Sequence, residues 1–167
     1  MTRDVIPNIR AATPADIAGL ARVHVQSWRE TYAGIIPQVF LDALSLESRQ
    51  QQWQRTLEVG NAVFVAELAD QIVGFASCGA ARDEGYDDEV YALYLLKSHH
   101  GQGIGKALFH AVLEALWSQS KRRVIVWVLA DNPTCKFYEY MGGVQTLEKP
   151  IEIGGATLLE FGFSFTV

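Results

Sequence analysis

One segment of the sequence, from Glu89 to Leu129, constrains the fold more than any other. It reads as a long apolar strand (Glu89 to Leu96), a glycine-rich turn, an amphipathic helix (Gly103 to Ser118) and a second apolar strand (Val124 to Leu129). Two strands joined through a helix lie parallel in one sheet, with a right-handed connection. The second strand has no polar residue, which is typical of a strand covered on both faces. The segment therefore predicts a sheet with helices on both faces.

The flanking sequence adds strands and helices on both sides of this segment. Apolar runs between turn residues predict five further strands, at Asn8–Ala12, Ala62–Glu67, Ile72–Ala80, Val144–Leu147 and Thr157–Phe165. A helix is predicted to begin after Thr13, with Pro14 at its first position and Asp16 at the spacing of a capping box. Residues 37–58 contain one or two further helices, and a short helix spans Pro133 to Met141.

Composition and charge limit the classes of function. The chain has 167 residues, which fits one domain over residues 1–167. Its net charge of -5 argues against a nucleic-acid partner, because such partners bind a basic face. No apolar run approaches the roughly 18 residues that span a bilayer, so we expect no membrane partner. Cys78 and Cys135 lack the spacing of a zinc site or a disulfide framework, which predicts a metal-free protein of the cytoplasm.

The glycine-rich turn carries the first functional signal; its sequence is His100-Gly101-Gln102-Gly103-Ile104-Gly105-Lys106. Glycines let a backbone approach a ligand closely, and the first turn of a helix presents unpaired N–H groups at a positive dipole end. Such a turn suits a pyrophosphate, although a tight connection between a strand and a helix explains it equally well. It is not a dinucleotide fingerprint, because Leu108 stands where the third glycine belongs, and no Gly-Lys-Ser/Thr of a P-loop occurs.

A second motif follows the Val124–Leu129 strand and makes the signal specific. It consists of Asn132-Pro133, then Phe137-Tyr138-Glu139, then Gly142-Gly143. Together with the strand and glycine loop from Leu93 to Leu108, this order resembles the GNAT superfamily of acyl-CoA N-acyltransferases, over about Val63 to Phe165. The resemblance implies an α+β (mixed α/β) fold. Its sheet is mixed, mostly antiparallel and twisted, with about seven strands, flanking helices and splayed central parallel strands.

The resemblance also implies an N-acetyltransferase with acetyl-CoA as its co-substrate. The loop is then expected to bind the pyrophosphate mainly through backbone amides, Leu95 and Leu96 to lend backbone groups to the pantetheine arm, and Asn132 to contact that arm. The predicted coenzyme contacts are therefore Leu95, Leu96, His100, Gly101, Gln102, Gly103, Ile104, Gly105, Lys106 and Asn132. His100 departs from the usual Gln or Arg, so the contribution of its side chain is open. Asn132 also suits a helix N-cap, and the two roles are compatible.

Two residues match catalytic positions of the resembled family. Tyr138 is expected to protonate the departing thiolate, since a phenol with a pKa near 10 is a suitable acid; packing beside Phe137 is its alternative role. Glu89 lies eleven residues before His100, where several members place a glutamate that takes the amine proton through a water. The polar end of a strand explains Glu89 equally well. The amine attacks directly, so Cys135 needs no covalent role.

The acceptor is expected to be a small-molecule amine or a peptide amine. Trp28 and Tyr32 stand four residues apart on one helix face and are predicted to wall the acceptor pocket, with core packing as the alternative. His24 lies on the same face and reads as a structural histidine with satisfied hydrogen bonds. The acidic loop before Glu89 either draws a cationic amine or is simply solvated. The resemblance makes a homodimer plausible, with the apolar last strand either in the core or across the dimer.

Two other functions compete with catalysis. A non-catalytic acyl-CoA-binding sensor on the same fold is the alternative, and the presence of Tyr138 and Asn132 favours the enzyme over it. A plain nucleotide- or phosphate-binding domain would use only the glycine loop, and the paired motif disfavours it.

Overall fold

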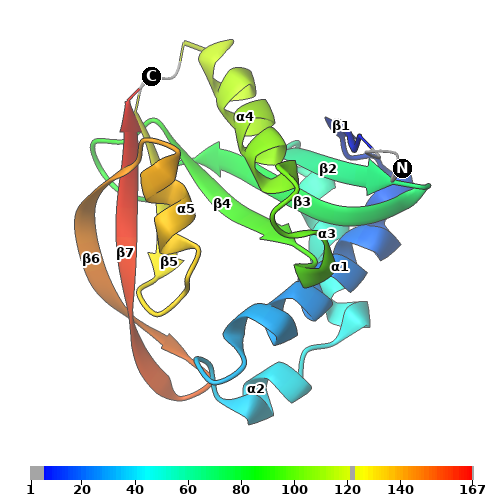
Figure 1. The fold of residues 1–167 in the computed structure, drawn as a ribbon, viewed down its shortest axis with the longest axis horizontal. Helices are drawn as coiled ribbons and strands as arrows, with labels where there is room; N and C mark the ends of the chain where they lie inside the picture. Colours follow the sequence, from blue (N-terminus) through cyan, green and yellow to red (C-terminus); the bar gives the residue numbers. More distant parts are fainter. Residues whose placement is uncertain (1–5, 121–122, 167) are drawn as a thin grey trace.

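A computed structural model describes residues 6–120 and 123–166, and within them the chain forms a seven-stranded sheet in the order β1-β2-β3-β4-β5-β7-β6 (Figure 1). The strands are β1 (Asn8–Ala11), β2 (Ala62–Leu68), β3 (Gln71–Ala80), β4 (Asp88–Leu95), β5 (Arg123–Leu129), β6 (Val144–Ile153) and β7 (Ala156–Thr166). Neighbouring strands in this described sheet are antiparallel, except that β4 and β5 are parallel. The mixed, mostly antiparallel sheet predicted from the sequence is confirmed.

The helices cover both faces of this sheet, as predicted. They are α1 (Ile17–Tyr32), α2 (Gln38–Asp42), α3 (Leu46–Glu58), α4 (Ile104–Trp117) and α5 (Cys135–Tyr140), with short 3-10 turns η1 (Pro14–Asp16) and η2 (Lys97–His99). Helices α4 and α5 share one buried cluster with the sheet, whereas α1 and α3 pack on another, and the end of α1 and α2 on a third. Figure 1 shows α5 beside β5 and α4 across β2 to β4.

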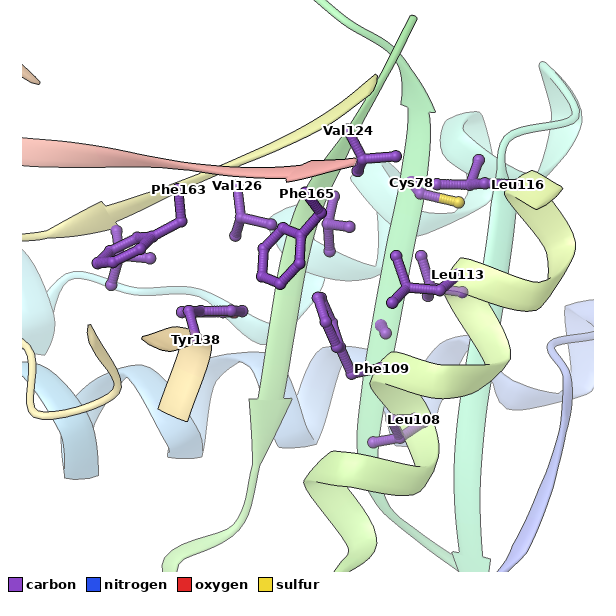
Figure 2. Close-up of a cluster of buried hydrophobic side chains, with 14 of the residues drawn as sticks. Cys78, Leu108, Phe109, Leu113, Leu116, Val124, Val126, Tyr138, Phe163 and Phe165 are labelled. Atoms are coloured by element: carbon purple, nitrogen blue, oxygen red, sulfur yellow. The ribbon is translucent and has the colours of Figure 1, made fainter. Parts of the chain in front are cut away.

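Aromatic packing under α4 and α5 joins the two halves of the sheet. Phe109 of α4 is fully buried, and its ring centroid lies 5.0 Å from that of Phe165 in β7. The ring centroid of Tyr138 in α5 lies 5.7 Å from that of Phe109, and the Tyr138 ring stacks on Phe163 (Figure 2). The alternating phenylalanines of the last strand therefore pack in the core, and β7 lies between β5 and β6 instead of at a sheet edge.

A capping hydrogen bond defines the start of the first helix, and two left-handed residues form the turn of the first hairpin. The Thr13 amide donates to the Asp16 carboxylate at 2.8 Å, so the predicted capping box is formed, and Pro14 follows the N-cap. Ala69 and Asp70 join β2 to β3 with positive φ angles of 47° and 60°. Both angles lie in the left-handed region, as a two-residue hairpin turn requires.

Among the described residues, the central strands β4 and β5 form three residue pairs. The pairs are Asp88–Val124, Glu89–Ile125 and Val90–Val126, although β4 continues to Leu95 and β5 to Leu129. The register of β3 against β4 shifts where Ser77 faces Ala92 and Cys78 faces Val90, which leaves Tyr91 as an extra residue. Such a bulge bends its strand. The splayed parallel strands predicted by resemblance are therefore present.

One strand extends well beyond its predicted end. We expected a strand over Val144–Leu147, but β6 runs to Ile153 and pairs with β7 along that length. Its charged residues and Pro150 hide the pattern, and both are tolerated because β6 is an edge strand. Across the described ranges, 6–120 and 123–166, no helix is both long and apolar enough to cross a membrane.

Candidate active site

The glycine loop lies at the end of β4 and opens α4. Gly101 and Gly103 have φ angles of 73° and 78°, and a Cβ built on either would meet no atom within 4 Å. The backbone is therefore left-handed at both positions, and the space in front of it is open. No side chain caps α4, and the backbone hydrogen bond from Ala107 to Gly103 is the first of the helix. The amides of Ile104, Gly105 and Lys106 are thus left to donate outward to an anion.

The His100 side chain turns back onto β4. Its Nε2 atom lies 2.9 Å from the Leu95 carbonyl oxygen, so Nε2 must carry the proton and donate it. The imidazole therefore braces the loop against the end of the strand, which is a structural use for the residue that departs from the usual Gln or Arg.

The two predicted pantetheine contacts at the end of β4, Leu95 and Leu96, differ in the hydrogen-bonding groups that their backbone leaves available. The Leu96 amide donates to Val73 at 3.0 Å, and the Leu96 carbonyl accepts from His99 at 2.9 Å, so both groups are used within the protein. Because backbone groups alternate along a strand, the Leu95 amide points the other way, toward the opening between β4 and β5. Leu95 is therefore the better placed donor for an extended ligand.

Asn132 follows β5 and faces the same region. It is buried, and its Oδ1 atom accepts from the Thr134 amide at 2.9 Å, which orders the turn before α5. The N-cap of α5 is Thr134, so the predicted N-cap role of Asn132 is wrong, because the helix begins later, at Cys135. The side-chain NH₂ retains donors for a ligand in the opening.

Tyr138 projects from α5 into the buried cluster of Figure 2. Burial is the main reason that the pKa of its phenol is raised above the usual value, and the nearby Tyr32 and Cys135 add to the effect. No described residue forms a hydrogen bond with its hydroxyl. The phenol is therefore protonated at neutral pH and available as a donor.

Trp28 and Tyr32 of α1 meet the end of β4 from the opposite face. The Tyr32 and Tyr94 hydroxyls lie 2.9 Å apart, and the ring centroids of Trp28 and Tyr32 are 4.9 Å apart. Burial raises the pKa of both phenols, and Asn132 is near enough to Tyr32 to lower its pKa in part. Tyr32 is buried in the third cluster with Trp28 packed against it, so both rings take part in core packing, and Asn132 lies next to Tyr32.

Comparison with known proteins identifies the chain. The model of the acetyltransferase (GNAT) family matches residues 20–142. The uncharacterized N-acetyltransferase YuaI of Bacillus subtilis (strain 168) is 38% identical over 161 residues, which cover 94% of this chain and 91% of YuaI. The chain belongs to the GNAT family of acetyltransferases. The family predicted from the two sequence motifs is confirmed.

Solved structures share this GNAT fold. A GCN5-related N-acetyltransferase from Rhodopseudomonas palustris has a TM-score of 0.79 at 21% identity, covering 97% of this chain and 96% of that one. The acetyltransferase yncA from Salmonella typhimurium, solved with acetyl-CoA, has a TM-score of 0.75 at 20% identity. The match covers 96% of this chain and 93% of yncA. At this identity the likeness concerns the fold.

Glu89 is buried on β4 directly before the strands part. Arg82 binds its carboxylate with two nitrogens: Arg82 Nε donates to Oε2 at 3.0 Å, and Nη2 contacts Oε1. Arg82 itself comes from the acidic loop before β4. The candidate base of this GNAT chain is thus paired with a guanidinium.

His24 differs from its predicted state. We expected satisfied hydrogen bonds, but its Nδ1 atom is buried and has no partner within the described residues. Its ring lies among the rings of Trp28, Trp53, Phe75 and Tyr94. Burial, together with the charge of Arg49, lowers the pKa of His24 to about 3, so the imidazole is neutral. The helical spacing that places His24 in the core gives no information on the hydrogen-bond partners of its ring.

Sequence reasoning missed two residues of this region, Tyr94 and Glu160. Tyr94 lies in the strand that was recognised, but only the opposite face of the sheet shows that its hydroxyl meets Tyr32. Glu160 is a buried carboxylate between Leu159 and Phe161, and a single charge in an apolar strand was the available signal. Among the residues that the structure describes, no group of three or more His, Cys, Asp or Glu is arranged to hold a metal ion.

Replacing Gly103 by alanine should weaken coenzyme A binding at least about 10-fold, because a Cβ at φ 78° costs about 1–2 kcal/mol and shifts the amides of the loop. Calorimetric titration with coenzyme A measures the effect. Gly60→Ala is the matched control, since Gly60 has φ 79° and open space in a turn remote from the loop. Both variants should lose similar stability, and equal coenzyme affinity in the two would contradict the role of the loop.

Proposed function

We propose that the protein transfers the acetyl group of acetyl-CoA to a primary amine by direct attack within a ternary complex. One observation carries the proposal: β4 and β5 part after Val90 and Val126, the N-terminus of α4 without a side-chain cap follows the end of β4, and α5 with Tyr138 follows the end of β5. The N-acetyltransferase YuaI and the acetyl-CoA complex of yncA support it.

The coenzyme fits the donors that the chain provides. The amides from Gln102 to Lys106 suit a pyrophosphate at a helix N-terminus, where local donors offset the negative charge of the whole protein. The Leu95 amide and the Asn132 NH₂ suit the amide groups of the pantetheine arm. The arm would thus take the place of a partner strand beside the end of β4. Bound there, the coenzyme supplies an activated acetyl thioester.

Tyr138 acts as the general acid in this proposal. The neutral amine nitrogen attacks the thioester carbonyl carbon, the carbon–sulfur bond breaks, and the thiolate takes the phenolic proton. The phenol is protonated at neutral pH, so its proton is present when the thiolate forms. Burial also raises the pKa of the Cys135 thiol, so that residue stays protonated and takes no covalent part.

Glu89 acts as the general base through a water. Its burial directly before the opening supports this role. Because Arg82 engages the carboxylate, the water must approach as that contact loosens. Trp28 and Tyr32 wall the acceptor side.

Three finer features stay predictions from the sequence. A cytoplasmic location is supported by two free cysteines, Cys78 and Cys135. A single catalytic domain over residues 1–167 and a homodimer complete the proposal.

The function itself is tested by release of free thiol from acetyl-CoA in the presence of a panel of primary amines. We expect at least one amine to raise release well above hydrolysis. If coenzyme A binds but no amine raises thiol release, the chain is an acyl-CoA sensor instead of an enzyme.

Tyr138→Phe should lower kcat by roughly 10²-fold or more, the scale of general acid catalysis, with little change in coenzyme affinity. Steady-state kinetics and coenzyme titration measure the two effects. Tyr140→Phe on the same helix is the matched control, because that side chain is exposed. Unchanged turnover in Tyr138→Phe would refute the assignment.

Glu89→Gln should alter the acidic limb of the pH–rate profile, because a base works only when it is deprotonated and glutamine cannot titrate. The profile of kcat/KM against pH measures this. Glu84→Gln, in the exposed part of the preceding loop, is the control. An acidic limb that is the same in all three proteins would assign Glu89 a structural role with Arg82.

A further inference from the structure

A lysine ammonium on β6 lies among one aromatic ring of β5, one carboxylate of β7 and one carboxylate of the loop before β4. The Lys149 Nζ atom is 3.9 Å from the centroid of the Trp127 ring. It is 3.7 Å from Glu160 Oε1 and 3.9 Å from Asp83 Oδ1. We call the group formed by Trp127, Glu160 and Asp83 the amine cage. An aromatic face with adjacent carboxylates is the chemistry that binds an organic ammonium.

Several features of the chain hold the amine cage in shape. Gly162 faces Trp127 across β5 and β7, and a Cβ at that glycine would lie 3.2 Å from the Trp127 ring. The missing side chain therefore lets the ring lie against β7. Trp127 Nε1 donates to Asp83 Oδ2 at 2.8 Å, which fixes the ring and the carboxylate together. Glu160 is the register partner of Lys149.

Lys149 lies farther from the Glu160 carboxylate than a hydrogen-bond donor normally does. The residue is 8% exposed, and burial is the main cause of its raised pKa. The Lys149 ammonium at 3.7 Å is beyond normal hydrogen-bond length. A charge-assisted hydrogen bond is stronger at normal length, so a cation that reaches this carboxylate more closely than Lys149 would be favoured. The Lys149 side chain is 43% exposed and is able to leave.

The amine cage lies near the proposed catalytic groups. Glu160 pairs with Leu129, the last residue of β5, where the strands have already parted. The charge of Glu160 raises the pKa of Tyr32, and the charges of Arg82 and Glu89 act on Glu160. The cage is therefore close enough to both Tyr32 and the Arg82–Glu89 pair for their charges to interact.

We propose that the amine cage binds one ammonium group of a diamine acceptor, and that Lys149 occupies the cage when no acceptor is present. The inference rests on the proposed acetyl transfer to an amine. With Lys149 displaced, the carboxylates of Asp83 and Glu160 lose their ammonium partner, while Arg82 stays paired with Glu89, so the cage is negative. It favours an acceptor with a second cation and no carboxylate. The other amine of the acceptor, unprotonated, is the group that is acetylated.

Three acceptors of equal chain length test this directly: 1,6-diaminohexane, hexylamine and 6-aminohexanoate. We expect KM to be lowest for the diamine, by about 10-fold or more, the scale of one charge-assisted hydrogen bond. Equal KM values for the diamine and hexylamine, or a preference for 6-aminohexanoate, would overturn the proposal.

Two variants separate the roles of the lysine and the carboxylate. Lys149→Met should lower KM for the diamine several-fold because it removes the internal competitor, whereas Glu160→Gln should raise it about 10-fold. Glu148→Gln is the matched control, since Glu148 is exposed on the same strand and next to Lys149. If neither variant changes KM for the diamine while thiol release proceeds, the cage is not the acceptor site.

Calorimetric titration of 1,6-diaminohexane into the protein with coenzyme A provides a readout that needs no turnover. Binding should be tighter for Lys149→Met and weaker for Glu160→Gln, and thermal unfolding checks that both variants are folded. Binding that is identical in wild type and both variants would refute the cage. If no amine supports thiol release but the diamine binds with this pattern, the proposed acetyl transfer is refuted, whereas the amine cage is supported as a diamine-binding site.

Discussion

The end of hydrogen bonding between β4 and β5 after three residue pairs is the constraint on which the site depends. Backbone N–H and C=O groups that lose a partner strand must find other partners or face solvent. At the end of β4 the His100 ring satisfies one such group, the Leu95 carbonyl. The bulge at Tyr91 makes the separation, since an extra residue in β4 bends the strand away from β5. The loop before α4 and the turn before α5 begin where these two strands end, which brings both to one opening.

The polar groups around the opening are neutral, whereas those of the neighbouring ion pair and amine cage are charged. Around the opening, Tyr32, Tyr94 and Tyr138 are buried phenols whose pKa values are raised, and His24 is neutral. These groups donate or share protons without adding net charge, which suits the departure of a thiolate. Next to them the Arg82–Glu89 pair and the amine cage contain charges in contact with one another. The arrangement separates proton donation from recognition of a cation.

Features that depend on short segments were predictable from the sequence, and features that depend on strand register were not. The unit from Glu89 to Leu129, the hairpin at Ala69-Asp70 and the capping box at Thr13 follow from local patterning and turn chemistry. The length of β6 was hidden because Pro150 and its charges look like a loop until β7 pairs with them. The contact between Lys149 and Trp127 joins strands that are not adjacent, so no sequence spacing reveals it. The missing partner of His24 likewise depends on rings from several elements.

Pro150 on β6 has a consequence for how copies of this chain meet. As an edge strand, β6 presents backbone groups that another strand would pair with, and extended sheets grow between molecules in this way. A proline supplies no N–H to such a neighbour, and the register shift between Gln145 and Leu147 distorts the same edge. Both features make this edge a poor template for strand addition. They favour a sheet that ends at β6 over one that continues into a neighbouring molecule there.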